Sequence, residues 1–152
     1  MSRTRIHHFD GFSIKKAGID IKLDMSRIEG NFNKAQYALD SAVMTSMVPF
    51  MPHRDGSFIN KTRAESAAIA GTGEVVAAAG PEGRFLYGGK VMVDPVTKSA
   101  YARKGAKKIL TTQSLQYSKA HNPKARAKWF DAAKEADGDK WVRTVKEIAG
   151  GG

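Results

Sequence analysis

One long amphipathic stretch constrains the fold more than any other feature of this sequence. Between residues 26 and 47, apolar side chains recur at spacings of three and four, the repeat that places residues on one face of an α-helix. These residues are Ile28, Phe32, Ala35, Leu39, Val43 and Met47. Ser26 and Glu29 have the S-x-x-E spacing of a capping box, and Pro49 stands where the helix would have to end. The sequence therefore predicts one long helix that buries a single apolar face.

Alternating residues predict β-strands on both sides of this helix. Residues 18–25 alternate between apolar and charged side chains, which predicts a short, half-buried strand. Its apolar face would consist of Ile19, Ile21, Leu23 and Met25. Residues 109–118 alternate again further along the chain. Between these strands, residues 49–60 are predicted to be a loop, and residues 61–71 fit either a helical turn or the start of a strand.

Residues 74–94 are interpreted as a β-hairpin. The segment 80–83, Gly-Pro-Glu-Gly, places proline and glycine where a tight turn favours them. One face of the second arm would carry Phe85, Tyr87, Val91 and Val93. Gly88-Gly89 within that arm predicts a β-bulge or a close approach by another backbone. The loop 94–108 follows, and loops of this length in compact domains are typically functional or mobile.

Two helical segments are predicted toward the end of the sequence. Asn122 is a favoured N-cap residue and Pro123 a favoured first helical residue, so the first segment would begin there. Asp137-Gly138 predicts a break between the two segments. The apolar sides of the two segments would be formed by Trp129, Phe130 and Ala133, and by Trp141, Val142, Val145 and Ile148. Each tryptophan is interpreted as a core residue in preference to an interface anchor.

These elements predict an α+β fold, in which an antiparallel sheet packs against a long N-terminal helix and a C-terminal helical region. Residues 1–18 would form a flexible N-terminal arm, residues 19–149 one α+β domain with a basic loop at 94–108, and residues 150–152 a disordered tail. The predicted core consists of Phe32, Leu39, Val43, Met47, Tyr87, Val91, Val93, Trp129, Phe130, Trp141 and Val145.

The distribution of charge indicates an anionic partner. The chain has a formal net charge of +10, and no acidic residue lies between Asp94 and Asp131. That interval contains Lys98, Arg103, Lys104, Lys107, Lys108, Lys119, Lys124, Arg126 and Lys128. Three interpretations remain open: a solvated surface, a nucleic-acid contact in which aromatic side chains such as Tyr101 stack on bases, and a protein interface.

The sequence lacks the usual patterns of catalytic and metal sites. It has no nucleotide-binding loop, no G-x-S-x-G motif and no cysteine, and its histidines have no metal-ligand spacing. We therefore expect a protein that is not an enzyme and has no cofactor. No apolar run has the length of a membrane helix and the first residues do not have the pattern of a secretory signal, so we expect no membrane partner. The absence of cysteine fits folding in a reducing cytoplasm.

The order of the motifs resembles a known family. The segments MVPFMPHRDGSF, FLYGGKVMVDP and HNPKARAKWFDAAKEADGDKWVRTVKEIAGG are similar to those of the minor capsid proteins of tailed bacteriophages, encoded among head–tail joining genes. The chain also resembles, more distantly, phage neck and tail-completion proteins. The resemblance covers residues 19–149. Its most specific parts are residues 87–95 and the run from Asn122 through Trp129 to Val142.

The resemblance implies a structural virion protein without enzymatic activity or cofactor. Copies would form a closed ring, of about six or twelve subunits, in the neck between capsid portal and tail. Its partners would be itself and neighbouring neck and tail proteins such as a connector, a stopper, a tail terminator or the tube. Passing duplex DNA is a further candidate partner. The protein would be made in the host bacterial cytoplasm and end in the virion. A basic nucleic-acid-binding protein, contacting phosphates through residues 98–128, is the alternative.

Three segments are expected to contact neighbouring subunits or rings: residues 1–18, 53–63 and 94–108. The candidate interface residues are His53, Arg54, Tyr101, Arg103, Lys104, Lys107, Lys108, Lys124, Arg126 and Lys128. Because strong phosphate binding inside a connector would impede the passage of DNA, we expect these charges to face mainly acidic proteins.

Overall fold

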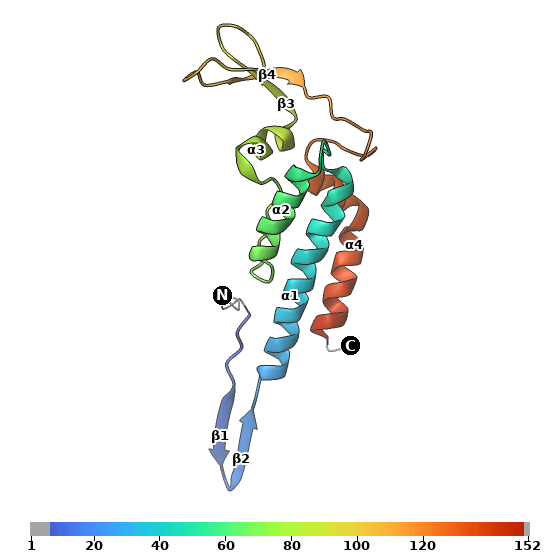
Figure 1. The fold of residues 1–152 in the computed structure, drawn as a ribbon. Helices are drawn as coiled ribbons and strands as arrows, with labels where there is room; N and C mark the ends of the chain where they lie inside the picture. Colours follow the sequence, from blue (N-terminus) through green and yellow to red (C-terminus); the bar gives the residue numbers. More distant parts are fainter. Residues whose placement is uncertain (1–6, 151–152) are drawn as a thin grey trace.

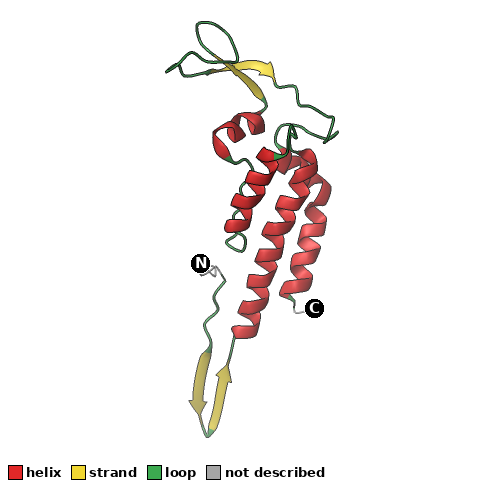
Figure 2. Cartoon of the chain, in the orientation of Figure 1, coloured by secondary structure: helices red, strands yellow, loops and turns green. Residues whose placement is uncertain are grey.

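The computed structural model describes residues 7–150 and has the predicted α+β class, which is confirmed. The elements of the described residues are β1 (Phe12–Lys16), β2 (Ile19–Leu23), α1 (Ser26–Met47), the 3₁₀ turn η1 (Val48–Phe50), α2 (Ser57–Ala68), α3 (Gly80–Gly88), β3 (Lys90–Val93), β4 (Ile109–Ser114) and α4 (Trp129–Ala149). The strands form two separate antiparallel pairs, β1–β2 and β3–β4. These pairs lie at opposite ends of an elongated helical body and do not form one sheet beneath the helices (Figures 1 and 2).

The hydrophobic core lies where α1 and α4 pack side by side (Figure 1). Met47 and Trp129 are fully buried, and Trp141 is also a core residue. The indole Nε1 of Trp129 donates a hydrogen bond to the Ala77 carbonyl over 2.7 Å, and its ring contacts the edge of Tyr87. A buried indole needs such a polar partner, so Trp129 also fixes the irregular segment between α2 and α3.

The other predicted core positions have graded exposure. Val43 belongs to the buried cluster, and Leu39, Tyr87 and Phe130 pack against it while partly exposed. Val91, Val93 and Val145 are half-buried and lie outside this cluster. Phe32 is exposed on one side, and its ring contacts Phe9 from the N-terminal segment.

The predicted long helix is confirmed over Ser26–Met47, but its predicted capping box is wrong. The residue before the helix is Met25, and no side chain caps it there. Asp24 Oδ1 accepts a hydrogen bond from the Ser26 amide at 2.9 Å, while the Glu29 carboxylate faces the N-terminal segment. Asp24 and Glu29 are both candidates to accept a hydrogen bond from the free Ser26 amide. Asp24, which precedes the helix, is the one that accepts it.

The predicted hairpin over residues 74–94 is wrong: residues 74–79 form no strand, α3 replaces the predicted turn and the start of the second arm, and only Lys90–Val93 of that arm form a strand. Residues Gly80–Gly88 form α3, with Pro81 in its first turn, and Gly89 ends the helix at φ 74°. Proline at the start and glycine at the end are signals of a helix as well as of turns. The predicted bulge at Gly88-Gly89 is absent. The close neighbour of Gly89 is a side chain: a Cβ on Gly89 would lie 2.6 Å from the Ala127 Cβ and 3.9 Å from the nearest backbone atom, the Ala127 Cα.

The helix predicted to begin at Asn122 is wrong, as is the break at Asp137-Gly138. Residues 119–128 form an irregular segment, and α4 runs without interruption over Trp129–Ala149. Asn122 does not cap a helix, because α4 begins only at Trp129. The amide nitrogen of Asn122 instead donates to the carbonyls of Val48 and Met51, at 3.0 and 2.9 Å. Gly138 remains helical because α4 packs side by side with α1, and tertiary packing outweighs a single weak helix former.

The N-terminal region forms a hairpin. Of the predicted arm, residues 1–6 lie outside the described residues, while Phe12–Lys16 form β1 and pair with β2. The predicted strand at 18–25 corresponds to β2, but its predicted half-burial is wrong, because all five residues of Ile19–Leu23 are exposed. Of the predicted tail, Gly150 directly follows α4, and residues 151–152 also lie outside the described part.

Candidate functional site

The basic residues gather at one end of the molecule. The loop between β3 and β4, the irregular segment before α4 and the turn between η1 and α2 all lie at the end of the helical body opposite the β1–β2 hairpin (Figure 1). We call this region the basic end; it contains two acids, the exposed Asp55 and the buried Asp94, and its basic residues are Arg54, Lys98, Arg103, Lys104, Lys107, Lys108, Lys119, Lys124, Arg126 and Lys128. All ten of these basic residues are exposed.

A single buried carboxylate organises the loop between β3 and β4. Asp94, the residue after β3, has no exposed surface. Its Oδ1 accepts hydrogen bonds from the amides of Val96 and Thr97, at 2.8 and 3.1 Å. Its Oδ2 accepts two from Arg103, one from the backbone amide at 3.0 Å and one from Nε at 2.9 Å. Asp94 therefore closes residues 94–103 into an ordered turn, in place of a freely moving loop.

The same contacts control the ionisation of Asp94. The side-chain hydrogen bond from Arg103, followed by that from the Arg103 backbone amide, holds the pKa of Asp94 well below its ordinary value. Hydrogen bonds to the charged form of a carboxyl favour that form. Asp94 therefore stays ionised, and its charge is directed inward to Arg103 and the backbone, so it offers no acidic surface to a partner.

The outer surface of this loop is cationic and carries one aromatic side chain. Tyr101 is 89 % exposed, and Lys98, Lys104, Lys107 and Lys108 are exposed around it in the sequence. Half of the Arg103 side chain also remains exposed, at 53 %, although its Nε is bound to Asp94. The loop can therefore present positive charge and one flat apolar ring to an anionic surface.

The segment before α4 is fixed to the helical body along its length. Besides Asn122, the amide of Arg126 donates to the Phe50 carbonyl and the amide of Lys128 donates to the Tyr87 carbonyl, at 3.0 and 2.9 Å. Ala125 is buried between them. Because the backbone is held on the inner side, the side chains of Lys124, Arg126 and Lys128 are left on the outer side.

Two histidines meet beside this segment. The rings of His53 and His121 lie 4.5 Å apart with an interplanar angle of 36°. His53 Nδ1 is buried and, among the described residues, has no hydrogen-bond partner. Lys124 Nζ lies 5.9 Å from the centre of the Phe50 ring. The predicted residues at 53, 54 and 124–128 are thus brought together by η1 and the segment before α4, while the predicted loop residues at 101–108 belong to the separate β3–β4 turn.

Sequence reasoning missed the residues that position this surface. The tertiary contacts of Asp94 and of Asn122 were not predicted from the sequence. For Asp94 a local signal exists, because an aspartate followed by proline is typical of a turn in which the aspartate side chain accepts hydrogen bonds from the next backbone amides. That pattern was available in the sequence. The long-range role of Asn122 was not, because Val48 and Met51 lie more than 70 residues earlier.

Comparisons with protein-family models, with curated proteins and with solved structures gave no match to this chain. Within residues 7–150, no helix combines the length and the apolar character needed to cross a bilayer. The same residues contain no group of three or more His, Cys, Asp or Glu side chains placed to hold a metal ion.

Proposed function

We propose that this protein is a structural virion protein of a tailed bacteriophage, a ring-forming component of the neck that joins the capsid portal complex to the tail. The observation that carries the proposal is the difference between the two ends of the molecule. One end projects a hairpin with one exposed apolar face, and the other projects an ordered cationic loop whose single acid, Asp94, is buried (Figure 1). A connector needs different surfaces for different neighbours, and the resemblance of the sequence motifs to phage minor capsid proteins favours the same role.

The basic end is proposed to contact acidic surfaces of neighbouring neck or tail proteins. Asp94 and Asn122 hold its loops in place before any partner binds, which lowers the entropy cost of association. Its positive charge would speed encounter with an acidic ring and fix the orientation of the contact. Duplex DNA that has to slide through a neck is a poorer partner, because tight phosphate contacts would slow its passage.

The decisive experiment asks where the protein is found and what its loss does. Mass spectrometry of purified phage particles should detect the chain in a fixed ratio to the portal protein. A phage with a stop codon in this gene should accumulate separate filled heads and complete tails. Absence of the chain from infectious particles, or normal particles without it, would overturn the proposal.

One observation favours the alternative function, nucleic-acid binding. Tyr101 is almost fully exposed among lysines and arginines, an arrangement that suits stacking on a base beside phosphate contacts. Filter binding of the purified protein to duplex and single-stranded DNA at several salt concentrations tests this alternative. A slope of log K against log salt near −0.9 per phosphate contact, reduced by about one contact in Lys104→Ala, would favour it. Tyr101→Ala should then weaken binding to single strands without changing the slope. Weak binding without that dependence favours the protein interface.

A further inference from the structure

The β1–β2 hairpin has one apolar face that the chain itself does not cover. The register pairs Phe12 with Leu23, Ile14 with Ile21 and Lys16 with Ile19, so five apolar side chains share one face, with Lys16 at its end beside the turn. Their exposed fractions lie between 42 and 62 %. The opposite face carries Ser13, Lys15, Asp20 and Lys22. Alternation of this kind is typical of a strand pair with one face against another surface.

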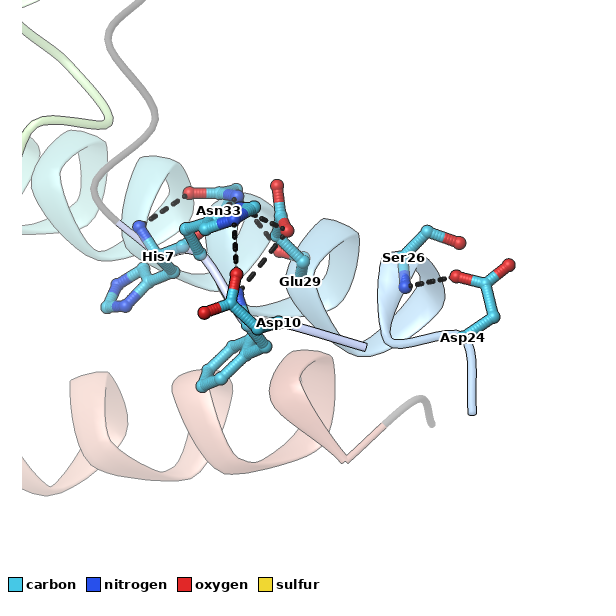
Figure 3. Close-up of polar contacts among 8 residues, drawn as sticks. His7, Asp10, Asp24, Ser26, Glu29 and Asn33 are labelled. Atoms are coloured by element: carbon cyan, nitrogen blue, oxygen red, sulfur yellow. Dashed lines mark hydrogen bonds and ion pairs between the residues drawn. The ribbon is translucent and has the colours of Figure 1, made fainter. Parts of the chain in front are cut away.

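The root of the hairpin is held firmly to α1. His7 and Asn33 exchange two hydrogen bonds, from the His7 amide to Asn33 Oδ1 and from Asn33 Nδ2 to the His7 carbonyl, at 3.3 and 3.0 Å (Figure 3). His8 Nδ1 lies 3.0 Å from Glu29 Oε2. On the other strand, Asp24 accepts from the Ser26 amide at the start of α1 (Figure 3). The hairpin therefore projects from a fixed base, beyond the N-terminal end of α1.

An isolated two-stranded hairpin is at best marginally stable in water, so this one needs a surface to cover it. The five apolar side chains are about half exposed, and a fully buried phenylalanine contributes about 150–250 Å². Together they offer on the order of 400 Å², about half of what one partner contributes to a standard interface. A contact of that size can drive specific association when its partner is also apolar.

An apolar groove of about 530 Å³ lies along α1 on the helical body. Its lining includes Leu39, Val43, Val75, Ala77 and Phe130. The acid at its edge, Asp40, is already satisfied, because its Oδ2 accepts from the amides of Gly71 and Gly73 and its Oδ1 from Gln36. The groove can therefore receive apolar side chains without leaving a buried polar group unpaired.

We propose that the apolar face of the β1–β2 hairpin of one copy docks in this groove of a second copy of the chain. This contact would join neighbouring copies in the ring of the proposed function. The inference rests on that proposed function for the closure of the assembly into a ring. Charge favours the hairpin as the contact between copies. Residues 10–24 contain three acidic and three basic residues, Asp10, Lys15, Lys16, Asp20, Lys22 and Asp24, whereas two basic ends would repel each other.

The contact is heterologous, hairpin to groove, and so each copy can bind two others. Repetition of such a contact gives a ring if the rotation closes and a filament if it does not. Two hairpins that paired with each other would instead give a closed dimer. These geometries make different predictions for cross-linking, and the chain contains no cysteine that would interfere.

Disulfide cross-linking between single-cysteine variants tests the geometry. Ile14→Cys mixed with Val75→Cys should give a cross-linked dimer of the two variants under mild oxidation. The matched control, Ser13→Cys with Val75→Cys, places the thiol on the opposite face of the hairpin and should give at least tenfold less product. A dimer formed by Ile14→Cys alone, in preference to the mixture, would overturn the groove as the docking site.

Sedimentation of the purified full chain tests the association itself. Ile21→Asp should weaken self-association at least tenfold, while Ser13→Asp, on the polar face, should leave it unchanged. Circular dichroism of both variants should show the same helix content, because the hairpin lies outside the helical core. A chain that sediments as a single copy at all concentrations would overturn this inference. Detection of that same chain in purified particles would still leave the neck function standing.

Discussion

The guanidinium of Arg103 is hydrogen-bonded to the fully buried carboxylate of Asp94, with Nε donating to Oδ2 over 2.9 Å. The backbone amide of Arg103 donates to the same oxygen. One residue thus uses both its main chain and its side chain to close the β3–β4 loop, while half of its side chain remains exposed. The position of the positive charge at the basic end is therefore determined by an acid that a partner cannot reach.

Replacing this carboxylate should release the loop. In Asp94→Asn, one acceptor oxygen becomes an amide nitrogen that faces the donors of Arg103 or of Val96 and Thr97. We expect hydrogen exchange of the amides at 96, 97 and 103 to become at least about tenfold faster, with the core unchanged. Lys104→Gln, on the exposed side of the loop, is the control and should leave those amides protected. Unchanged protection in Asp94→Asn would show that the loop is held by other contacts.

The loop should also open in acid. The folded pKa of Asp94 lies below its unfolded value, so its ionised contacts stabilise the loop above the unfolded pKa, about 3.9. That contribution is lost as the pH falls through the folded value. NMR signals of the loop should therefore remain native at pH 5 and begin to change only below about pH 4. In Asp94→Asn the loop signals should show no such acid transition.

Two adjacent glycines should respond in opposite directions to alanine. Gly89 has φ 74°, and a Cβ there would overlap Ala127, so Gly89→Ala should destabilise the protein by about 1–3 kcal/mol. Gly88 is helical, and a Cβ added there would have no heavy atom within 4 Å, so Gly88→Ala should be neutral or stabilise by up to about 1 kcal/mol. Urea unfolding measures both free energies. Equal effects of the two substitutions would contradict the helix end placed between them.

The polar contact of Trp129 should be measurable separately from its packing. Trp129→Phe removes the donor to the Ala77 carbonyl and should lower the free energy of unfolding by about 1–3 kcal/mol. Trp129→Ala also removes the ring and should cost about 3–5 kcal/mol. Val142→Ala, at an exposed position on the same helix, should change stability by less than about 0.5 kcal/mol. A Trp129→Phe variant as stable as the wild type would show that this hydrogen bond makes no net contribution to the free energy of unfolding.

The sequence predicted the parts of the fold that depend on local periodicity. The bounds of α1 follow from its apolar repeat and Pro49, and the positions of β2 and β4 follow from alternation. The same periodicity overestimated burial in β2, because alternation shows that a strand has two unlike faces but not that this chain covers one of them. The α3 error arose because proline and glycine mark helix ends and turns alike.

The arrangement of the basic end was less predictable, because it depends on contacts between residues far apart in the chain. Its charge was evident from the acid-free interval. The start of α4 was not, since Asn122 binds η1 and Lys128 adopts a φ of 51° just before the helix. No local pattern distinguishes an asparagine that caps a helix from one that holds a loop against another element.

The turn of the β1–β2 hairpin offers a last prediction, on stability and docking together. Ala17 and Gly18 connect the strands with φ values of 52° and 79°, and a two-residue turn with two positive φ values favours Asn-Gly. Ala17→Asn should therefore stabilise the hairpin by up to about 1 kcal/mol, whereas Ala17→Val, β-branched at a positive φ, should destabilise it. NMR of the β1 and β2 amides measures the folded fraction of the hairpin. Neither substitution touches the apolar face, so if docking uses the folded hairpin, sedimentation should show tighter self-association for Ala17→Asn and weaker for Ala17→Val. Identical association of the two variants would mean that the hairpin does not have to be folded to bind a second copy.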